Sequence, residues 1–236
     1  MNPKVTWSIL GFLLLAIFVL TFMKPPEAIA ALLTAVSADA RTYSLLVHIA
    51  CVFVFVSGLL VAGLRTKLYS FFMAFLSLSA TVVAVVYMII PNIIVFAIFS
   101  VLIIHAYATR QLSFPLENIR SLDLLFGGLA LVFGFWYLHW VEDPIWINAL
   151  LYSPLGVVNC PTMLMVCGFL CLSQQPRSPF LEGTVALITL YFGFFGLFRL
   201  GAYVDVTLIL CALFLLARLT ASMTRERVLR ESDSTG

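Results

Sequence analysis

The stretch LYSFFMAFLSLSATVVAVVYMIIPNIIVFAIFSVLIIHAYAT, residues 68–109, contains 42 consecutive residues without Asp, Glu, Lys or Arg. A helix that crosses a bilayer needs about 20 mostly apolar residues, so this stretch is long enough for two. Pro91 and Asn92 stand near its middle, and a proline with asparagine is a turn signal. The stretch therefore predicts two membrane helices joined by a turn.

Charge-free runs of the same character lie on both sides of this stretch. They cover residues 5–23, 42–64, 124–141, 144–176, 183–198 and 206–217. Together with the central pair they predict eight transmembrane helices in an all-α, polytopic membrane bundle. We expect a single transmembrane domain over residues 1–223 and a polar cytoplasmic tail over residues 224–236.

The composition excludes several classes of protein. Of the 236 residues, 63% are hydrophobic and 10% are charged, whereas soluble domains are about 25% charged. Lys and Arg number 13 against 11 Asp and Glu, so no basic surface is available for nucleic acid. The expected partner is the lipid bilayer, with other membrane subunits or further copies of the chain as alternatives. An enzymatic activity is not indicated.

The basic residues predict an orientation. With the N-terminus in the cytoplasm, ten of the 13 Lys and Arg residues fall in cytoplasmic segments and three fall outside. The ten are Lys4, Arg65, Lys67, Arg110, Arg120, Arg177, Arg218, Arg225, Arg227 and Arg230, and the three are Lys24, Arg41 and Arg199. Both termini are therefore expected inside. Cleavage of residues 1–30 as a signal peptide is the alternative, although the apolar run exceeds the usual 7–15 residues of such peptides.

Two further segments are expected to lie along the membrane surface. Residues 28–36 are rich in Ala and Leu and are too short to cross, and residues 144–153 lead into the predicted sixth span. Trp136, Trp140 and Trp146 cluster near the second segment, and tryptophan is enriched at membrane–water interfaces.

The tetrapeptide Asn159-Cys160-Pro161-Thr162 lies within the predicted sixth span. Proline inside a helix removes one N–H donor and breaks the bond to the carbonyl four residues earlier, here that of Val157. A thiolate together with freed carbonyls is suited to a soft, partly dehydrated ion. We therefore expect a substrate- or ion-binding site at this broken helix, with a proline kink packed by small side chains as the alternative.

Three more side chains are candidates for the same site. His48 and Cys51 are three residues apart and share a face of the predicted second span, near the outer side of the membrane. His139 lies at the outer end of the predicted fifth span. No cofactor is the first expectation; a soft metal ion at Cys160, or haem b between His48 and His139, are the alternatives.

Arg199 and Asp205 stand on either side of a short hairpin between the last two predicted spans. A lone charge at the centre of a membrane helix costs roughly 2.5–3.5 kcal/mol on the insertion scale, and less near the interface. We therefore expect Arg199 and Asp205 to form a structural ion pair that joins the two helices.

Residues 152–171 (YSPLGVVNCPTMLMVCGFLC) and 197–213 (LFRLGAYVDVTLILCAL) resemble an uncharacterised family of bacterial multi-pass membrane proteins. That family carries a Cys-Pro-Thr helix followed by a hairpin with an Arg-Leu-Gly…Asp-like element, and some members are labelled permeases. The resemblance implies a bacterial origin, location in the cytoplasmic (inner) membrane, and importance of the Cys-Pro-Thr motif and Asp205. It covers about a third of the chain and implies no catalytic residue.

Three functions are compatible with these features. The first is a small permease or transporter with its site at the broken sixth helix, because transporters bind substrates at interrupted helices. The second is a non-catalytic accessory or scaffold subunit of a larger membrane complex. The third is a membrane redox protein that binds haem or a metal.

Overall fold

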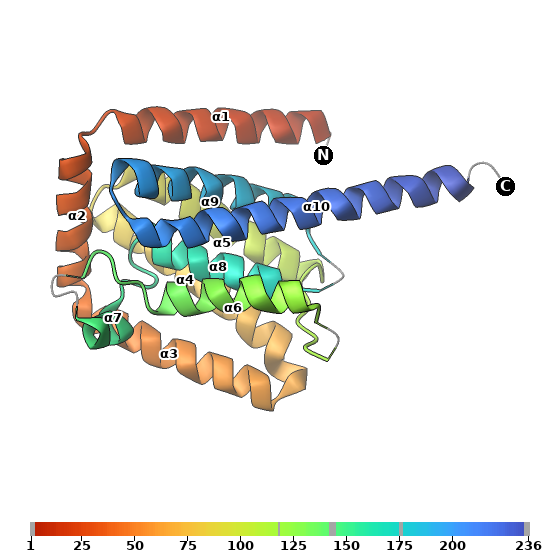
Figure 1. The fold of residues 1–236 in the computed structure, drawn as a ribbon, viewed down its shortest axis with the longest axis horizontal. Helices are drawn as coiled ribbons and strands as arrows, with labels where there is room; N and C mark the ends of the chain where they lie inside the picture. The colour runs from red at the N-terminus through yellow and green to blue at the C-terminus, as the bar shows by residue number, and fades with distance from the viewer. Residues whose placement is uncertain (1–2, 118, 142–144, 175–176, 234–236) are drawn as a thin grey trace.

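The computed structural model describes residues 3–117, 119–141, 145–174 and 177–233, and no β-strand occurs within these ranges. The all-α prediction is therefore confirmed for the described residues. The elements, in chain order, are α1 (Pro3–Phe22), α2 (Pro26–Asp39), α3 (Arg41–Leu60), α4 (Ala62–Val86), α5 (Ile90–Ala108), α6 (Ser121–Phe135), α7 (Trp146–Tyr152), α8 (Asn159–Leu172), α9 (Pro179–Arg199), the short 3₁₀ turn η1 (Tyr203–Asp205) and α10 (Val206–Asp233). Helix α1 begins and α10 ends on the same side of the bundle (Figure 1).

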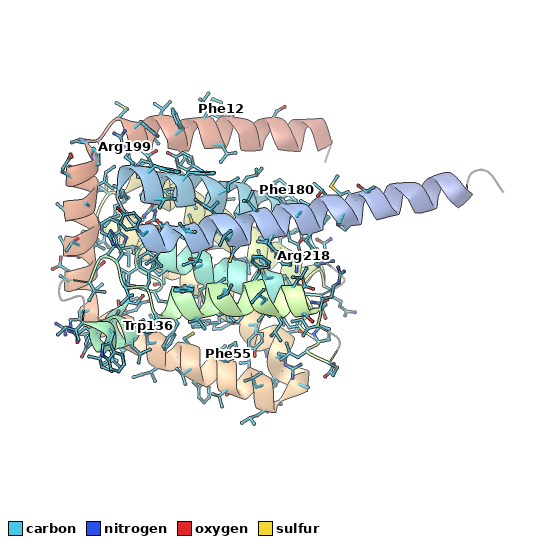
Figure 2. The ribbon with its side chains drawn as sticks, viewed as in Figure 1. Phe12, Phe55, Trp136, Phe180, Arg199 and Arg218 are labelled. Atoms are coloured by element: carbon cyan, nitrogen blue, oxygen red, sulfur yellow. The ribbon has the colours of Figure 1, made fainter. Side chains whose placement is uncertain are left out.

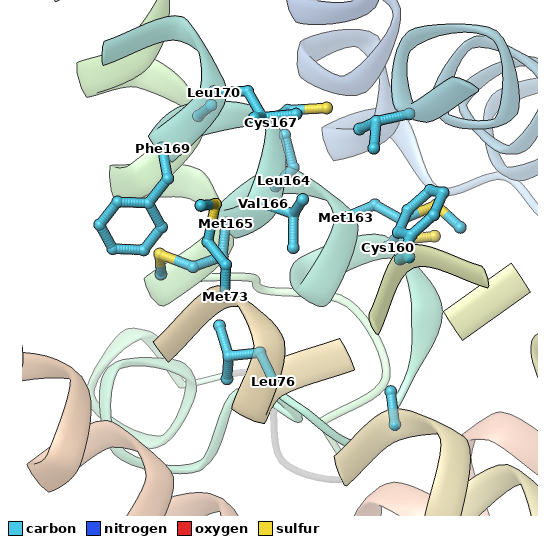
Figure 3. Packing of buried hydrophobic residues seen from close by; sticks show 14 of the residues in the cluster. Met73, Leu76, Cys160, Met163, Leu164, Met165, Val166, Cys167, Phe169 and Leu170 are labelled. Carbon is cyan, nitrogen blue, oxygen red and sulfur yellow. The ribbon is translucent and has the colours of Figure 1, made fainter. Parts of the chain in front are cut away.

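Helix α8 forms the centre of the bundle. All of its 14 residues are buried, and a helix that is buried on every side belongs to a protein core. It packs against α4, α6, α9 and α10. Figure 3 shows Met73 of α4 beside Met165 of α8 in this core.

Among the residues that the structure describes, five helical segments are long and apolar enough to cross a membrane. They are Arg41–Leu60, Ala62–Val86, Ile90–Ala108, Pro179–Arg199 and Tyr203–Thr224. A sixth is counted if Leu14–Phe22 and Pro26–Asp39, which are bent by 98° at their junction, form one span. This count differs from the expected eight because α6 and α8 have only 15 and 14 residues.

Helix α8 is short because the charge-free run over residues 144–176 does not form one continuous helix. The described residues of this run divide into α7, a buried irregular segment over residues 153–158, and α8. In that segment Gly156 has φ +72°, a conformation that glycine adopts without strain. Hydropathy does not distinguish such a segment from a helix, since both are buried and apolar.

The outer surface of the bundle is strongly apolar. Large side chains such as Phe12 on α1, Leu60 on α3 and Phe198 on α9 are at least 75% exposed, and Figure 2 labels Phe12. Soluble proteins rarely expose contiguous apolar patches of more than a few hundred Å². The helices and their surface are those of a multi-pass membrane protein.

Helices α2 and α7 occupy the segments expected along the membrane surface. Helix α2 runs across the direction of α1 rather than continuing it, and α7 lies near the far end of α2 (Figure 1). At the other end of the chain, α10 continues to Asp233, so the expected polar tail is helical over most of its length. The last three residues lie outside the described part.

A network of ionised side chains joins four helices on the side of the bundle where α6 and α9 begin. The Arg218 guanidinium of α10 donates to Asp123 of α6 at 3.2 Å and to Glu182 of α9 at 2.8 Å. It also donates to the carbonyls of Leu170 and Cys171, both at 2.7 Å, in the last turn of α8. Carbonyls at a helix C-terminus lack intrahelical partners, so Arg218 satisfies the end of α8 and two carboxylates together.

A close approach of α6 and α8 depends on glycine. A Cβ atom at Gly168 of α8 would lie 2.8 Å from Cδ2 of Leu131 and 3.0 Å from the backbone nitrogen of Leu131 in α6. Small residues at helix interfaces allow backbones to approach in membrane bundles. A side chain larger than that of glycine at position 168 would therefore prevent α6 and α8 from packing this closely.

Replacing Gly168 by alanine should lower the free energy of unfolding by about 1–3 kcal/mol, because the added methyl group pushes α6 away from α8. Thermal unfolding of the purified protein in detergent measures the change. Gly128→Ala in α6 is the matched control, since a Cβ atom there meets nothing within 4 Å and alanine favours the helix. Equal losses from the two substitutions would contradict this account of the interface.

Candidate functional site: a buried thiol, carboxyl and phenol

Three polar side chains meet inside the bundle. The Tyr137 hydroxyl donates to Oδ1 of Asp205 at 2.5 Å, and the Cys160 thiol donates to Oδ2 of the same carboxyl group at 3.2 Å. Tyr137 and Asp205 are 0% exposed and Cys160 is 1% exposed. Groups that ionise are costly within a membrane, so such a cluster is a candidate functional site. We call these three residues the Asp205 cluster.

Each member of the Asp205 cluster comes from a different part of the chain. Asp205 ends η1, the turn that joins α9 to α10. Cys160 is in the first turn of α8, and Tyr137 follows the end of α6. Gly196 of α9 faces the carboxyl group, and a Cβ atom at this position would lie 1.7 Å from Oδ2 of Asp205. The absence of a side chain at Gly196 therefore makes room for the cluster.

The Asp205 cluster is held together by hydrogen bonds to one carboxyl group. The carboxyl group accepts two hydrogen bonds, and the phenol of Tyr137 and the thiol of Cys160 are the donors. Among the described residues, the ion pairs include none with Asp205. The chemistry available here is hydrogen bonding to a carboxyl group in a site closed to water.

Pro161 begins a helix instead of breaking one, which corrects the sequence prediction. Helix α8 starts at Asn159, so Pro161 stands in its first turn, where an N–H group has no intrahelical partner. Thr162 stabilises this start: its hydroxyl donates to the carbonyl of Val158 at 2.7 Å and accepts from the N–H of Gly156 at 2.9 Å. The interruption lies in the buried segment before α8.

The expected ion pair between Arg199 and Asp205 is not formed. Arg199 donates to the carbonyl of Lys24 at 3.3 Å, and its guanidinium lies 4.4 Å from the centre of the Phe22 ring. Asp205 instead accepts hydrogen bonds inside the bundle from Tyr137, and from Cys160. The ion pair was predicted because Arg199 and Asp205 are close in sequence. This prediction is wrong because the turn places the Asp205 side chain inside the bundle. Arg199 and Arg218 lie toward opposite ends of the bundle (Figure 2).

The histidine candidates occupy other places. The ring nitrogens of His48 lie 2.8 Å from the carbonyl of Ser44 and 2.9 Å from that of Phe135. His139 packs against Trp140 with ring centres 4.3 Å apart. Cys51 lines an apolar groove between α3 and α6. Within the described ranges, no three His, Cys, Asp or Glu side chains gather as a metal site would require.

A cavity of about 120 Å³ lies beside the first turn of α8. Its walls come from α1, α2, α5, α8 and α9 and from the segments next to them. Asn159, the residue before Cys160, lines it and is 5% exposed. The Asn159 Oδ1 atom is buried and has no hydrogen-bond partner within the described part of the chain.

Sequence reasoning missed Tyr137 and the Arg218 network. Tyr137 stands between Trp136 and Trp140 near the end of the predicted fifth span, and the indole of Trp136 donates to the carbonyl of Trp146 at 3.0 Å. No spacing rule connects Tyr137 to a residue 68 positions later. Arg218 had a usable signal, because it follows an apolar run without a nearby acidic residue in sequence.

The Asp205 cluster and the adjoining cavity together form the candidate site. Both depend on the start of α8, where Asn159 faces the cavity and Cys160 faces the carboxyl group. Comparison of the chain with protein-family models, with curated proteins and with solved structures found no match.

Proposed function

We propose that the protein is a small permease of a bacterial inner membrane, with its binding site at the start of α8. The observation that carries this proposal is the Asp205 cluster in the interior of an apolar bundle, beside a cavity. Irregular backbone occurs at membrane depth only where protein buries it or where it lines a cavity. The buried segment over residues 153–158 meets that condition, and transporters place substrate sites at such interruptions.

The proposed topology has eight membrane crossings with both termini in the cytoplasm. The ten-to-three distribution of basic residues supports it. The fold is compatible with it, since α1 begins and α10 ends on one side (Figure 1). The short helices α6 and α8 then cross with help from the irregular segments that flank them.

Reporter fusions check this topology. Fusions after Arg65, Arg120 and Arg177 and at the C-terminus should all report a cytoplasmic location, because these sites follow the basic segments. A fusion after Arg199 should report the opposite side. A periplasmic signal at Arg120 or Arg177 would overturn the eight-crossing arrangement.

Release of solutes from proteoliposomes tests the permease function. Vesicles containing the purified protein are loaded with a mixture of small polyols, amides, amines and carboxylates, and the retained amounts are measured by mass spectrometry. The wild type should release at least one solute class faster than protein-free vesicles, and Asp205→Asn should lose this effect while purifying as a folded protein. Identical retention in wild-type and protein-free vesicles would refute the proposal.

A second proposed function is that of an accessory subunit in a larger membrane complex. An apolar groove of about 440 Å³ on the lipid-facing side of α3 and α6 favours it. Gly128 lines this groove, and a Cβ atom there would meet nothing within 4 Å, so a partner helix can approach closely. Native mass spectrometry of the protein extracted from its own membrane distinguishes a bound subunit from a lone chain. The visible spectrum and metal content of the same sample test the redox alternative.

A further inference from the structure

We infer that the cavity beside the α1–α2 bend binds a small organic anion, with the apolar body of the anion inside the cavity and its charged group beside Lys24 and Arg199. The inference rests on the proposed permease function for the use made of the anion, whereas the binding is argued from the side chains around the cavity. Two observations carry it: the walls are apolar, and two basic side chains without acidic partners meet at one edge.

The walls of the cavity suit a hydrocarbon body about the size of a benzene ring. The volume of the cavity is about 120 Å³, and an engineered apolar cavity of about 150 Å³ binds benzene. Most of the lining side chains are aliphatic or aromatic, and they include Ile29 and Leu33 of α2 and Phe192 and Phe195 of α9. Transfer of an apolar group from water to such walls is favourable, so the cavity suits the uncharged part of an amphipathic molecule.

Two basic side chains that are far apart in sequence meet at one edge of this cavity. Lys24 lies between α1 and α2 and lines the cavity. Arg199 ends α9, and its Nη2 group donates to the carbonyl of Lys24 at 3.3 Å. The Arg199 guanidinium lies 6.0 Å from the centre of the ring of Phe195, which lines the cavity. Figure 2 shows Arg199 at the corner where α1 meets α2. An anion with its body in the cavity therefore has two cationic groups beside its charge.

No ion pair neutralises these two charges within the described part of the chain. The residues that line the cavity include no Asp or Glu, and the ion pairs of the described residues involve neither Lys24 nor Arg199. Glu27, three residues after Lys24, is exposed and does not line the cavity. Lys24 and Arg199 are also two of the three basic residues expected on the outer side, where membrane proteins carry few. Two such cations beside an apolar cavity attract an anion and repel a cation.

The inferred anion site adjoins the Asp205 cluster at the end of α9. Phe195 lines the cavity, and the next residue, Gly196, packs against the Asp205 carboxyl group. Arg199 is four residues after Phe195, so both side chains lie on the same face of α9. The end of this one helix therefore contributes a wall of the cavity, one of its two cations, and a contact with the site of the proposed permease function.

Ligand-observed NMR with benzenesulfonate and benzenesulfonamide tests the inference on the full chain in phosphatidylcholine nanodiscs. The two probes have the same ring and the same number of non-hydrogen atoms, but only benzenesulfonate is charged at neutral pH. Benzenesulfonate should bind saturably and at least about threefold more tightly than benzenesulfonamide, because the ion pair adds to the burial of the ring. Empty nanodiscs measure the partitioning of each probe into lipid.

Three variants separate the contribution of charge from that of the cavity. Lys24→Met should weaken benzenesulfonate binding at least about threefold and leave benzenesulfonamide binding unchanged, because methionine keeps an apolar stem without the charge. Leu33→Phe, which narrows the cavity from α2, should weaken the binding of both probes. Arg41→Met is the matched control and should change neither, since Arg41 is the third basic residue expected outside and its guanidinium lies 4.1 Å from the centre of the Tyr152 ring.

Nanodiscs that contain phosphatidylglycerol distinguish a free anion from an anionic lipid, which offer the same combination of charge and apolar body. Both kinds of nanodisc are compared at the same high salt concentration, which screens the surface charge of the bilayer. Benzenesulfonate binding that phosphatidylglycerol does not change assigns the site to a free anion. Competition by phosphatidylglycerol that Lys24→Met relieves assigns it to an anionic lipid.

Equal binding of the two probes, or benzenesulfonate binding that is undiminished in both Lys24→Met and Leu33→Phe, would overturn the inferred site. Saturable benzenesulfonate binding by a protein that releases no solute from proteoliposomes would refute the permease function and leave the site intact. Release of other solutes by a protein that does not bind benzenesulfonate would refute the site and leave the permease function intact.

Discussion

Replacing Arg218 by methionine should lower the free energy of unfolding by about 3–5 kcal/mol, because it leaves two buried carboxylates without their shared cation. The side chains of Arg218, Asp123 and Glu182 are each at most 4% exposed. The substitution also removes the donors to the carbonyl groups at the end of α8. Methionine preserves most of the packing volume of the arginine side chain. The loss of stability therefore measures the contribution of the charge and of its hydrogen bonds. Unfolding in mixed detergent micelles measures it.

Two further variants identify the cause of that loss. Arg120→Met is the matched control, since the Arg120 side chain is 67% exposed and lies 3.9 Å from Asp123; exposed pairs contribute about 0–1 kcal/mol. The triple variant Arg218→Met, Asp123→Asn, Glu182→Gln removes both carboxylate charges, whose other basic neighbours, Arg120 and Arg177, lie 3.9 Å away. It should regain part of the stability. A loss from Arg120→Met equal to that from Arg218→Met would contradict the assignment of the network to Arg218.

The sequence was most informative where a helix is long and uniform. The charge-free stretch over residues 68–109 forms most of α4 and all of α5. The turn lies at residues 87–89, and Pro91 and Asn92, where the turn was expected, are in the first turn of α5. Hydropathy failed over residues 144–176, because the irregular backbone there is satisfied by tertiary partners rather than by water. Ser79 of α4 donates to the carbonyl of Gly156 at 2.6 Å, and Thr162 accepts from its N–H group. No local pattern shows that such partners exist.

The candidate site was predicted by residue type and not by pairing. Cys160 was identified from the Asn-Cys-Pro-Thr motif as a soft ligand at an interrupted helix. Asp205 was expected in a structural ion pair with Arg199, because a lone charge at membrane depth is costly. The predicted partner of Asp205, Arg199, was wrong, and Tyr137 was not predicted at all. The pairing depends on the conformation of the turn between α9 and α10, which places the Asp205 side chain inside the bundle. The Tyr137 hydroxyl reaches Asp205 only because α6 ends beside the α9–α10 turn.

Replacing Gly196 by alanine should lower the free energy of unfolding by about 2–6 kcal/mol and should disrupt the Asp205 cluster. The new Cβ atom would lie 1.7 Å from Oδ2 and 2.8 Å from Cγ of Asp205, so the carboxyl group must move. Overpacking of this kind costs about 1–3 kcal/mol. The hydroxyl of Tyr137 and the thiol of Cys160 then lose their acceptor, which adds about 1–3 kcal/mol for buried groups left unpaired.

A double-mutant cycle distinguishes this steric cause from a general weakness of α9. In Gly196→Ala with Asp205→Ala, the nearest atom of residue 205 is its Cβ at 3.4 Å, an ordinary contact, so the double variant should lose less stability than the sum of the single variants. Gly196→Ala with Asp205→Asn keeps an atom at the clashing position and should show no such recovery. Additive losses in the alanine pair would contradict the clash. The alanine pair should also fold yet release no solute from proteoliposomes, because its packing is restored while the carboxyl group that accepts from Tyr137 and Cys160 is gone.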